Sequence, residues 1–283
     1  MKKILTVALL LTAFCAAPAQ ELIVISSPNL HADDSVLVFV PEKYQANYSD
    51  KYCLECFGDP DPVPALYLLH GWSGCYSNWR DKSDIQAFAD RYGFIIICPD
   101  GFYDSWYVNA DDHRDEMQWR DFFDKELYPM MKEKYFLDPE QTFITGLSMG
   151  GHGAINVFLD DVSRFRAAGS MSGVLDLDHE RGRLGLERLL GPWSEGCERY
   201  ARESAINRIS RAKDSGKLMV ISCGYSDTLF GASLDFCQRC KEEGVGYIGI
   251  FSPGVHSWKY WDYALDLHLW YFSKILRGEN LGY

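Results

Sequence analysis

Residues 142–160 read TFITGLSMGGHGAINVFLD, and this stretch decides the fold. Its first part is a short apolar run typical of a buried strand, and its last part is typical of a helix. Between them lies Ser148, with Gly146 and Gly150 two residues away on either side. A strand-to-helix turn tight enough to expose a serine hydroxyl leaves no room for side chains at those two positions. A chance Gly-x-Ser-x-Gly sequence lacks this context, so the stretch predicts a nucleophilic serine.

Apolar runs and helical segments alternate on both sides of this stretch. Predicted strands lie at 65–70, 94–98, 142–146, 218–223 and 247–251, and predicted helices at about 83–91, 114–135, 149–160 and 261–277. Strands that are apolar on both faces are typical of parallel sheets covered by helices on both sides. The sequence therefore predicts the α/β class and the α/β-hydrolase fold, with a mostly parallel central sheet and helices on both faces.

Three further segments complete the predicted fold. Apolar runs at 21–26 and 35–40 flank turn-forming residues and predict an antiparallel pair at the start of the sheet. Residues 41–64 hold four prolines and predict a loop. Residues 176–211 contain no strand-like run, which predicts helices inserted between two strands, where they shape one side of a substrate pocket.

The first 19 residues have the pattern of a secretory signal peptide. Lys2 and Lys3 precede an apolar run at 4–17, and Ala-Pro-Ala precedes Gln20. We expect cleavage after Ala19, export to the periplasm or the medium, and one domain at 20–283. A lipoprotein anchor on Cys15 is disfavoured by the bulky residue before it. No later run approaches the roughly 20 apolar residues that a membrane-spanning helix needs, so no membrane span is predicted.

The net charge of the chain limits the classes of molecule that it is expected to bind. Loss of Lys2 and Lys3 takes the formal net charge from −12 to −14. A surface of that sign repels polyanions, so nucleic acid is not an expected partner, whereas neutral sugar esters and small esters carry no such penalty. No cofactor is expected, and the sequence leaves the oligomeric state open.

Eight cysteines remain after the predicted cleavage. Cys98 and Cys223 end apolar runs and are expected to be buried. The others, which lie in polar or loop-like surroundings and are candidates for disulfides, are Cys53, Cys56, Cys75, Cys197, Cys237 and Cys240. The two Cys-x-x-Cys pairs would form a zinc site only if the fold brought them together, and we predict no metal.

A serine nucleophile needs a base, and in this fold the chain order is serine, acid, histidine. His256 follows the strand-like run at 247–251 in the loop Ser-Pro-Gly-Val-His and is the predicted base. His152 lies too close on the same helix, His179 precedes the last strands, and His268 falls inside a predicted helix.

The acid is expected on the loop after the preceding strand. Asp227 follows the run at 218–223 directly, in Gly-Tyr-Ser-Asp, and is the predicted acid, with Asp235 and Asp262 as rivals. Two backbone N–H groups are needed to bind the oxyanion. Met149, next to the nucleophile, is predicted to supply one, and Trp72, in the loop His-Gly-Trp-Ser-Gly, the other; His70 is expected to shape that loop.

Five motifs in order resemble the esterase D family: LLHGWSG (68–74), CPDG followed by SWYVN (98–109), TGLSMGG (145–151), CGYSD (223–227) and PGVHSW (253–258). That family is similar in fold to bacterial feruloyl and acetyl-xylan esterases, tributyrin esterases, S-formylglutathione hydrolases and mycolyltransferases. The resemblance spans roughly residues 35–275 and implies the same triad, Ser148, Asp227 and His256, with Trp72 and Met149 as oxyanion donors. Trp72 departs from the family, where many relatives carry Met, Leu or Thr, and the cysteine-rich segment 53–75 matches no member.

Export disfavours a glutathione-linked substrate and makes the protein resemble the carbohydrate-processing branch. We therefore expect an esterase acting on feruloyl or acetyl side groups of plant polysaccharide, or on other short-chain esters. The alternatives are an acyltransferase of the mycolyltransferase type and a non-catalytic glycan-binding protein on a hydrolase scaffold. Trp106 and Tyr107 follow a strand end and Trp258 lies beside the base, so all three are predicted to contact substrate. Core filling is the alternative for each of them.

Overall fold

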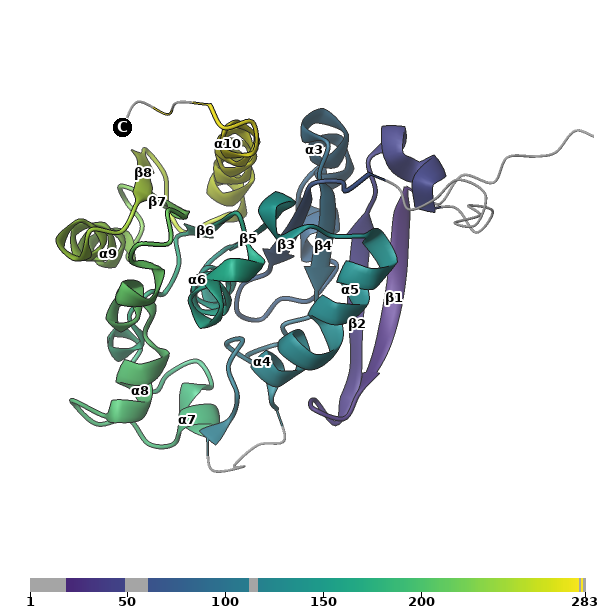
Figure 1. Cartoon of the computed structure of the whole chain (residues 1–283). Coiled ribbons are helices and arrows are strands. Elements are labelled where there is room, and N and C mark those ends of the chain that lie inside the picture. Colours follow the sequence, from purple (N-terminus) through teal and green to yellow (C-terminus); the bar gives the residue numbers. More distant parts are fainter. Residues whose placement is uncertain (1–18, 49–60, 112–116, 280, 282–283) are drawn as a thin grey trace, which may run out of the picture.

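The computed structural model describes residues 19–48, 61–111, 117–279 and 281. It has one eight-stranded sheet in the order β1-β2-β4-β3-β5-β6-β7-β8 (Figure 1). The strands are β1 (Gln20–Ser27), β2 (Ala32–Phe39), β3 (Ala65–Leu69), β4 (Ile95–Pro99), β5 (Thr142–Gly146), β6 (Ala167–Met171), β7 (Leu218–Gly224) and β8 (Tyr247–Ser252). β1, β2 and β4 pair antiparallel, and all other neighbours pair parallel. This is the α/β-hydrolase fold, as the sequence predicted.

The middle strands are buried on both faces because alternate side chains enter two separate cores. Tyr67 and Leu69 of β3 point into one cluster, and Leu66 and Leu68 into the other. The helices that cover the first cluster are α4 (Trp119–Phe122), α5 (Tyr128–Tyr135), α6 (Met149–Asp160) and α9 (Phe230–Glu243). Those that cover the second are α2 (Asn78–Lys82), α3 (Ile85–Tyr92) and α10 (Trp258–Leu276), and Figure 1 shows α3 and α10 on the face opposite α6.

Three parts of the fold differ from the sequence prediction. β6 and α9 were not predicted. The predicted helix at 114–135 consists of α4, the π-helical turn η3 (Phe123–Leu127) and α5 in succession, and residues 112–116 lie outside the described part. Short 3-10 helices complete the chain: η1 (Glu42–Tyr48), in the predicted loop, η4 (Pro139–Gln141) and η5 (Val162–Arg164).

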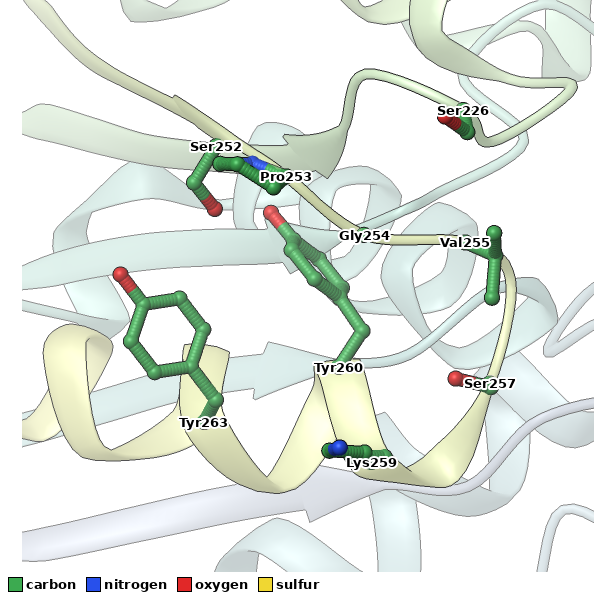
Figure 2. Close-up of a pocket in the computed structure, with 9 residues that line it drawn as sticks. All are labelled: Ser226, Ser252, Pro253, Gly254, Val255, Ser257, Lys259, Tyr260 and Tyr263. Carbon is green, nitrogen blue, oxygen red and sulfur yellow. The ribbon is translucent and has the colours of Figure 1, made fainter.

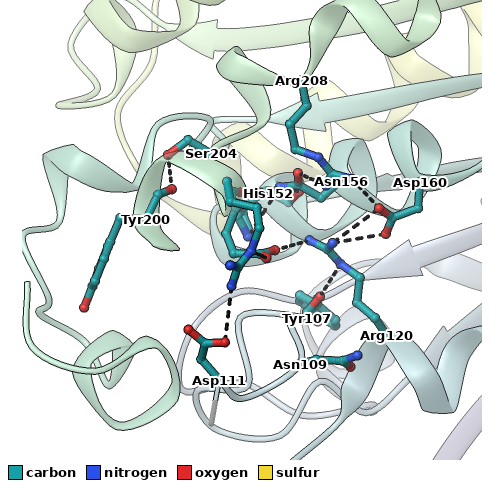
Figure 3. Close-up of polar contacts among 12 residues, drawn as sticks. Tyr107, Asn109, Asp111, Arg120, His152, Asn156, Asp160, Tyr200, Ser204 and Arg208 are labelled. Carbon is teal, nitrogen blue, oxygen red and sulfur yellow. Dashed lines mark hydrogen bonds and ion pairs between the residues drawn. The ribbon is translucent and has the colours of Figure 1, made fainter. Parts of the chain in front are cut away.

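The segment between β6 and β7 is a helical insertion, as predicted. Its elements are η6 (Leu177–His179), α7 (Leu186–Leu190), α8 (Glu198–Glu203), η7 (Ala205–Asn207) and η8 (Ile209–Ala212). Figure 3 shows the polar network that ties it to α6. Arg120 of α4 contacts Asp160 at 3.1 Å and Glu203 at 3.0 Å, and Arg208 donates to Asn156 at 2.6 Å and also pairs with Asp160. These half-buried contacts link α4 and the insertion to the helix that follows Ser148.

The cysteine predictions are partly corrected. Cys98 and Cys223 are buried, as predicted. Cys237 and Cys240 are not in a polar loop: both are buried on the core-facing side of α9 with free thiols, and burial raises the pKa of Cys237 to about 12. The remaining described cysteines, Cys75 and Cys197, are also free, whereas the Cys53/Cys56 pair lies outside the described residues. Within the described ranges no cluster of three or more His, Cys, Asp or Glu side chains is arranged to hold a metal ion.

Two further predictions concern the signal peptide and the membrane-spanning helices. The signal peptide at 1–19 falls almost entirely outside the described residues and remains a prediction. Among the helices that the structure describes, none combines the length and the apolar character that crossing a bilayer requires.

Candidate active site

Ser148 lies on the sharp turn between β5 and α6. Its backbone has φ 52° and ψ −117°, a conformation that a residue with a side chain rarely adopts. The turn is held by the Ser148 N–H, which donates to the Met171 carbonyl of β6 at 2.9 Å. A methyl group at Gly146 would overlap the Gly150 carbonyl, and one at Gly150 would overlap the carbonyls of Leu69 and His70. Both glycines are therefore required by close backbone contacts, as the motif predicted.

The loops after β7 and β8 carry the predicted acid and base, and they lie in direct contact. The N–H groups of Tyr225 and Ser226 donate to the carbonyls of Ser252 and Gly254, both at 2.9 Å. A side chain at Gly224 would overlap the backbone of Gly254, so this approach needs glycine. Two loops that are adjacent in the sheet are thus joined backbone to backbone, which fixes the acid relative to the base.

The structure brings the three predicted triad residues together. His256 Nε2 lies 3.0 Å from Ser148 Oγ, and His256 Nδ1 lies 2.9 Å from Asp227 Oδ2. The other Asp227 oxygen accepts from the Leu229 N–H at 2.9 Å. Trp261 packs against the His256 ring in a T-shaped arrangement, with a centroid distance of 4.8 Å. In this arrangement Nδ1–H donates to the carboxylate and Nε2 is free to accept the serine proton.

Asp227 is held as an anion at the end of this chain of hydrogen bonds. The residue is buried, with 6% of its surface exposed, and burial raises its pKa. The hydrogen bonds from His256 and the Leu229 N–H lower it by more, so that the pKa of Asp227 lies below its usual value. A carboxylate that stays ionised is suited to orient the imidazole and to stabilise an imidazolium.

Neither of the two predicted oxyanion donors is used in a hydrogen bond within the described part of the protein. Neither the Met149 N–H, at the start of α6, nor the Trp72 N–H has a hydrogen-bond acceptor within the described part of the chain. Buried or half-buried backbone N–H groups are nearly always paired, so two unpaired groups flanking Ser148 suit a ligand oxygen. The positive end of α6 adds to the same field.

His70 fixes the direction of one of these donors. The Gly101 N–H donates to His70 Nε2 at 2.7 Å, so the ring proton sits on Nδ1, which donates to the Gly71 carbonyl at 2.8 Å. Asp100 lies farther from Nε2, at 3.3 Å, and accepts instead from the Phe102 N–H at 2.7 Å. In a trans peptide the C=O and N–H point in opposite directions. Holding the Gly71 carbonyl toward the buried ring therefore turns the N–H of the next residue, Trp72, away from it.

We expect His70→Ala to lower kcat for p-nitrophenyl acetate by about 10²- to 10³-fold, the usual effect of losing one oxyanion donor. His70→Asn, which offers a side-chain N–H near the Nδ1 position, should recover part of that loss. Steady-state kinetics and the melting temperature of both variants provide the measurement. An equal loss of kcat in both, in step with a loss of stability, would show that His70 only supports the fold.

A pocket of about 680 Å³ opens beside Ser148. Trp72, Trp258 and Trp261 supply most of its aromatic wall. The other residues that line it are Gly71, Ser73, Gly74, Asn78, Lys82, Leu147, Ser148, Leu184, His256 and Ser257. Trp258, predicted to contact substrate, is therefore in position to do so. No sequence signal pointed to Lys82 and Asn78, which belong to the short helix α2, or to Leu184, which belongs to the insertion.

The prediction for Trp106 and Tyr107 is corrected. Both side chains are buried, with 1% and 0% of their surface exposed, and neither lines this pocket. The Tyr107 hydroxyl donates to the His70 carbonyl at 2.9 Å, and its ring fills the space left by Gly153 of α6. Trp106 Nε1 donates to the Leu184 carbonyl at 2.9 Å, which also accepts from Trp72 Nε1 at 3.1 Å. Core filling, the alternative reading, is the correct one, and Trp106 helps to place the pocket wall.

Comparison with known proteins identifies a family and several relatives of this chain. Residues 27–271 match the family described as "Putative esterase". An acetyl esterase of Caldicellulosiruptor saccharolyticus is 25% identical over 232 residues, which are 77% of this chain and 86% of that protein. An S-formylglutathione hydrolase of Mus musculus is 30% identical over 240 residues, 76% of this chain and 84% of that protein.

The fold comparison gives the same result. The solved structure of FphF, a fluorophosphonate-binding serine hydrolase of Staphylococcus aureus, superposes with a TM-score of 0.77 at 24% identity, covering 90% of this chain and 98% of that one. At that identity the likeness concerns the fold. The family match covers most of the chain and confirms the resemblance found in the sequence. The chain belongs to the "Putative esterase" family and is a carboxylic ester hydrolase.

Proposed function

We propose that this protein is an exported serine esterase that uses Ser148 as nucleophile, His256 as base and Asp227 as the orienting acid. The observation that carries the proposal is the continuous line of hydrogen bonds from Asp227 through His256 to Ser148, at 2.9 and 3.0 Å, at the edge of an open pocket. Nucleophile, base and orienting group within hydrogen-bond reach of one another are the geometric signature of nucleophilic catalysis.

In the first half of the reaction, Ser148 Oγ attacks the ester carbonyl carbon while His256 Nε2 takes the hydroxyl proton. The carbonyl oxygen becomes an oxyanion and accepts from the N–H groups of Trp72 and Met149. When the intermediate collapses, the bond from carbon to the leaving oxygen breaks and His256 returns the proton to that oxygen. The alcohol leaves, and the acyl group stays on Ser148.

In the second half, water takes the place of the alcohol. His256 removes a proton from water, the hydroxide oxygen attacks the acyl carbon, and the same two N–H groups stabilise the second oxyanion. Collapse breaks the bond to Ser148 Oγ, which recovers its proton from His256. The products are the free acid and the unchanged enzyme.

We further propose that the substrate is a plant polysaccharide carrying acetyl or feruloyl side groups. Three features support this proposal: the signal-like residues 1–19, the similarity to an acetyl esterase, and a pocket wall of three tryptophans, Trp72, Trp258 and Trp261. Indole rings pack well against both sugar faces and phenolic rings. The pocket is also broad enough, at about 680 Å³, to hold an ester together with part of its sugar.

The proposal is tested by acid release from p-nitrophenyl acetate, p-nitrophenyl butyrate, methyl ferulate and acetylated xylan, with the protein starting at Gln20. We expect release of acetate from xylan or of ferulate from its methyl ester. Brisk cleavage of p-nitrophenyl butyrate with no release from either of those two would reject the polysaccharide substrate and leave a general short-chain esterase.

Two other outcomes separate the competing activities. Product analysis in the presence of excess xylobiose distinguishes hydrolysis, which yields only free acid, from acyl transfer, which yields a new sugar ester. Labelling by a fluorophosphonate probe reports whether Ser148 is nucleophilic at all. A folded protein that is neither labelled nor active would favour a glycan-binding function on this scaffold.

A further inference from the structure

A second pocket, of about 530 Å³, lies beside the loop that carries His256 (Figure 2). It is formed by the end of β8, the loop that follows and the first turns of α10. The residues that line it are Ser226, Ser252, Pro253, Gly254, Val255, Ser257, Lys259, Tyr260 and Tyr263. Ser257 also lines the pocket that contains Ser148, so the two pockets adjoin on either side of the His256 loop.

Two hydroxyl groups in this pocket are buried without well-formed hydrogen bonds. Neither the Tyr260 hydroxyl nor Ser252 Oγ has a described partner at good hydrogen-bond geometry, although Ser252 and Ser222 lie close to the Tyr260 hydroxyl. Figure 2 shows the Tyr260 and Ser252 oxygens facing one another. The Tyr260 side chain is 4% exposed, and its ring packs so closely under Gly254 that a side chain there would overlap it. A buried hydroxyl without a well-formed hydrogen bond is costly, so this pair suits a ligand that supplies hydroxyl groups.

The rim of the pocket carries exposed apolar and aromatic side chains and one lysine. Tyr263 and Val255 are 49% and 52% exposed, and Figure 2 shows the Tyr263 ring beside Tyr260. Lys259 adds an ammonium that makes no ion pair with any described residue. A site with two hydroxyls on its inner side and an exposed aromatic ring at its rim suits a pyranose ring, whose hydroxyls both donate and accept and whose C–H face packs on aromatic rings.

We propose that this second pocket is a sugar subsite, which holds a pyranose unit of the polysaccharide while the ester lies at Ser148. The proposal rests on the proposed function, because it places the leaving alcohol of that substrate. The sugar ring packs on Tyr263, and its hydroxyls bond to the Tyr260 hydroxyl and Ser252 Oγ. Since Ser257 is shared by both pockets, a chain of sugars is able to pass from one to the other along the His256 loop.

The test measures binding of xylotetraose, which carries no ester, by the rise in melting temperature and by calorimetry. We expect binding to the wild type and a Kd about tenfold higher, or more, for Tyr260→Phe, which removes only the hydroxyl. Tyr271→Phe is the matched control: the same change on the same helix, outside the pocket, with no expected effect on binding. Without ligand, the melting temperature of Tyr260→Phe should stay close to that of the wild type because only one hydroxyl is lost, and this measurement is the control for misfolding.

Failure of this proposal is distinguishable from failure of the proposed function. If xylotetraose binds in a Tyr260-dependent way but no ester of xylan is cleaved, the subsite stands and the substrate assignment falls. If acetylated xylan is cleaved while xylotetraose does not bind, or binds equally to the wild type and Tyr260→Phe, the subsite is wrong. The KM for acetylated xylan should rise in Tyr260→Phe in parallel with the Kd.

Discussion

Ser148→Ala should lower kcat for p-nitrophenyl acetate by about five to six orders of magnitude, because nucleophile and base act as one unit and neither is useful alone. The reason lies in the geometry: His256 Nε2, 3.0 Å from Ser148 Oγ, has no other proton to take on the path to an acyl-enzyme. The remaining activity would come from the unpaired N–H groups of Trp72 and Met149 and from binding alone.

The measurement is single-turnover and steady-state release of p-nitrophenol, with fluorophosphonate labelling as a second readout. Ser210→Ala is the matched control, because this exposed serine makes no described side-chain hydrogen bond and belongs to the insertion. Labelling and turnover should vanish only in the first variant. A loss of less than about a hundredfold in Ser148→Ala would contradict the assignment of the nucleophile.

The central strands could be predicted because they are buried on both faces and therefore read as unbroken apolar runs. β6 could not, since its sequence, AAGSM, contains one large side chain. The structure gives the reason. A side chain at Gly169 would overlap Thr145 and His268, so β6 needs small residues where α10 packs on it. A strand whose residues are chosen for close packing carries no β-branched signature.

Helix α9 was also missed, although the spacing of its apolar residues in the sequence is that of a helix. Ser233, Phe236, Cys237 and Cys240 are its buried residues, and their spacing of three, one and three is that of one helix face. The Cys-x-x-Cys spacing within this face instead made the two cysteines candidates for disulfide formation or, together with Cys53 and Cys56, for a zinc site. Burial on a helix explains the two cysteines fully.

The proximity of Ser148, Asp227 and His256 could be predicted because α/β-hydrolase topology orders such residues along the chain, and each follows a strand end. The pocket could not be predicted, since its walls come from side chains that are distant in sequence. The Leu184 carbonyl, for example, meets the indoles of Trp72 and Trp106 only because the insertion folds back over the sheet's edge. Trp106 and Tyr107 were misassigned for the same reason: the sequence places them after a strand end but does not show which way they point.

Asp227→Asn should lower kcat by about 10⁴-fold while leaving KM nearly unchanged. The Leu229 N–H donates to Asp227 Oδ1 at 2.9 Å, so an asparagine must place its carbonyl oxygen there. Its NH₂ group then faces His256 Nδ1 and donates to it, which forces the ring proton onto Nε2. An Nε2–H facing Ser148 is unable to accept the serine proton, and the base is lost although every heavy atom stays in place.

Asp235→Asn is the matched control, because this rival acid is exposed on α9 and should affect neither kcat nor KM. Stability gives an independent readout. Since the pKa of Asp227 lies below its usual value in the folded state, the stability it contributes is present above its unfolded pKa and is lost as the pH falls through the folded pKa. The unfolding free energies of wild type and Asp227→Asn should therefore differ most near neutral pH and converge in acid. A kcat loss below tenfold, or an equal loss in Asp235→Asn, would remove Asp227 from the triad, because a carboxylate that only fills space is replaceable by its amide.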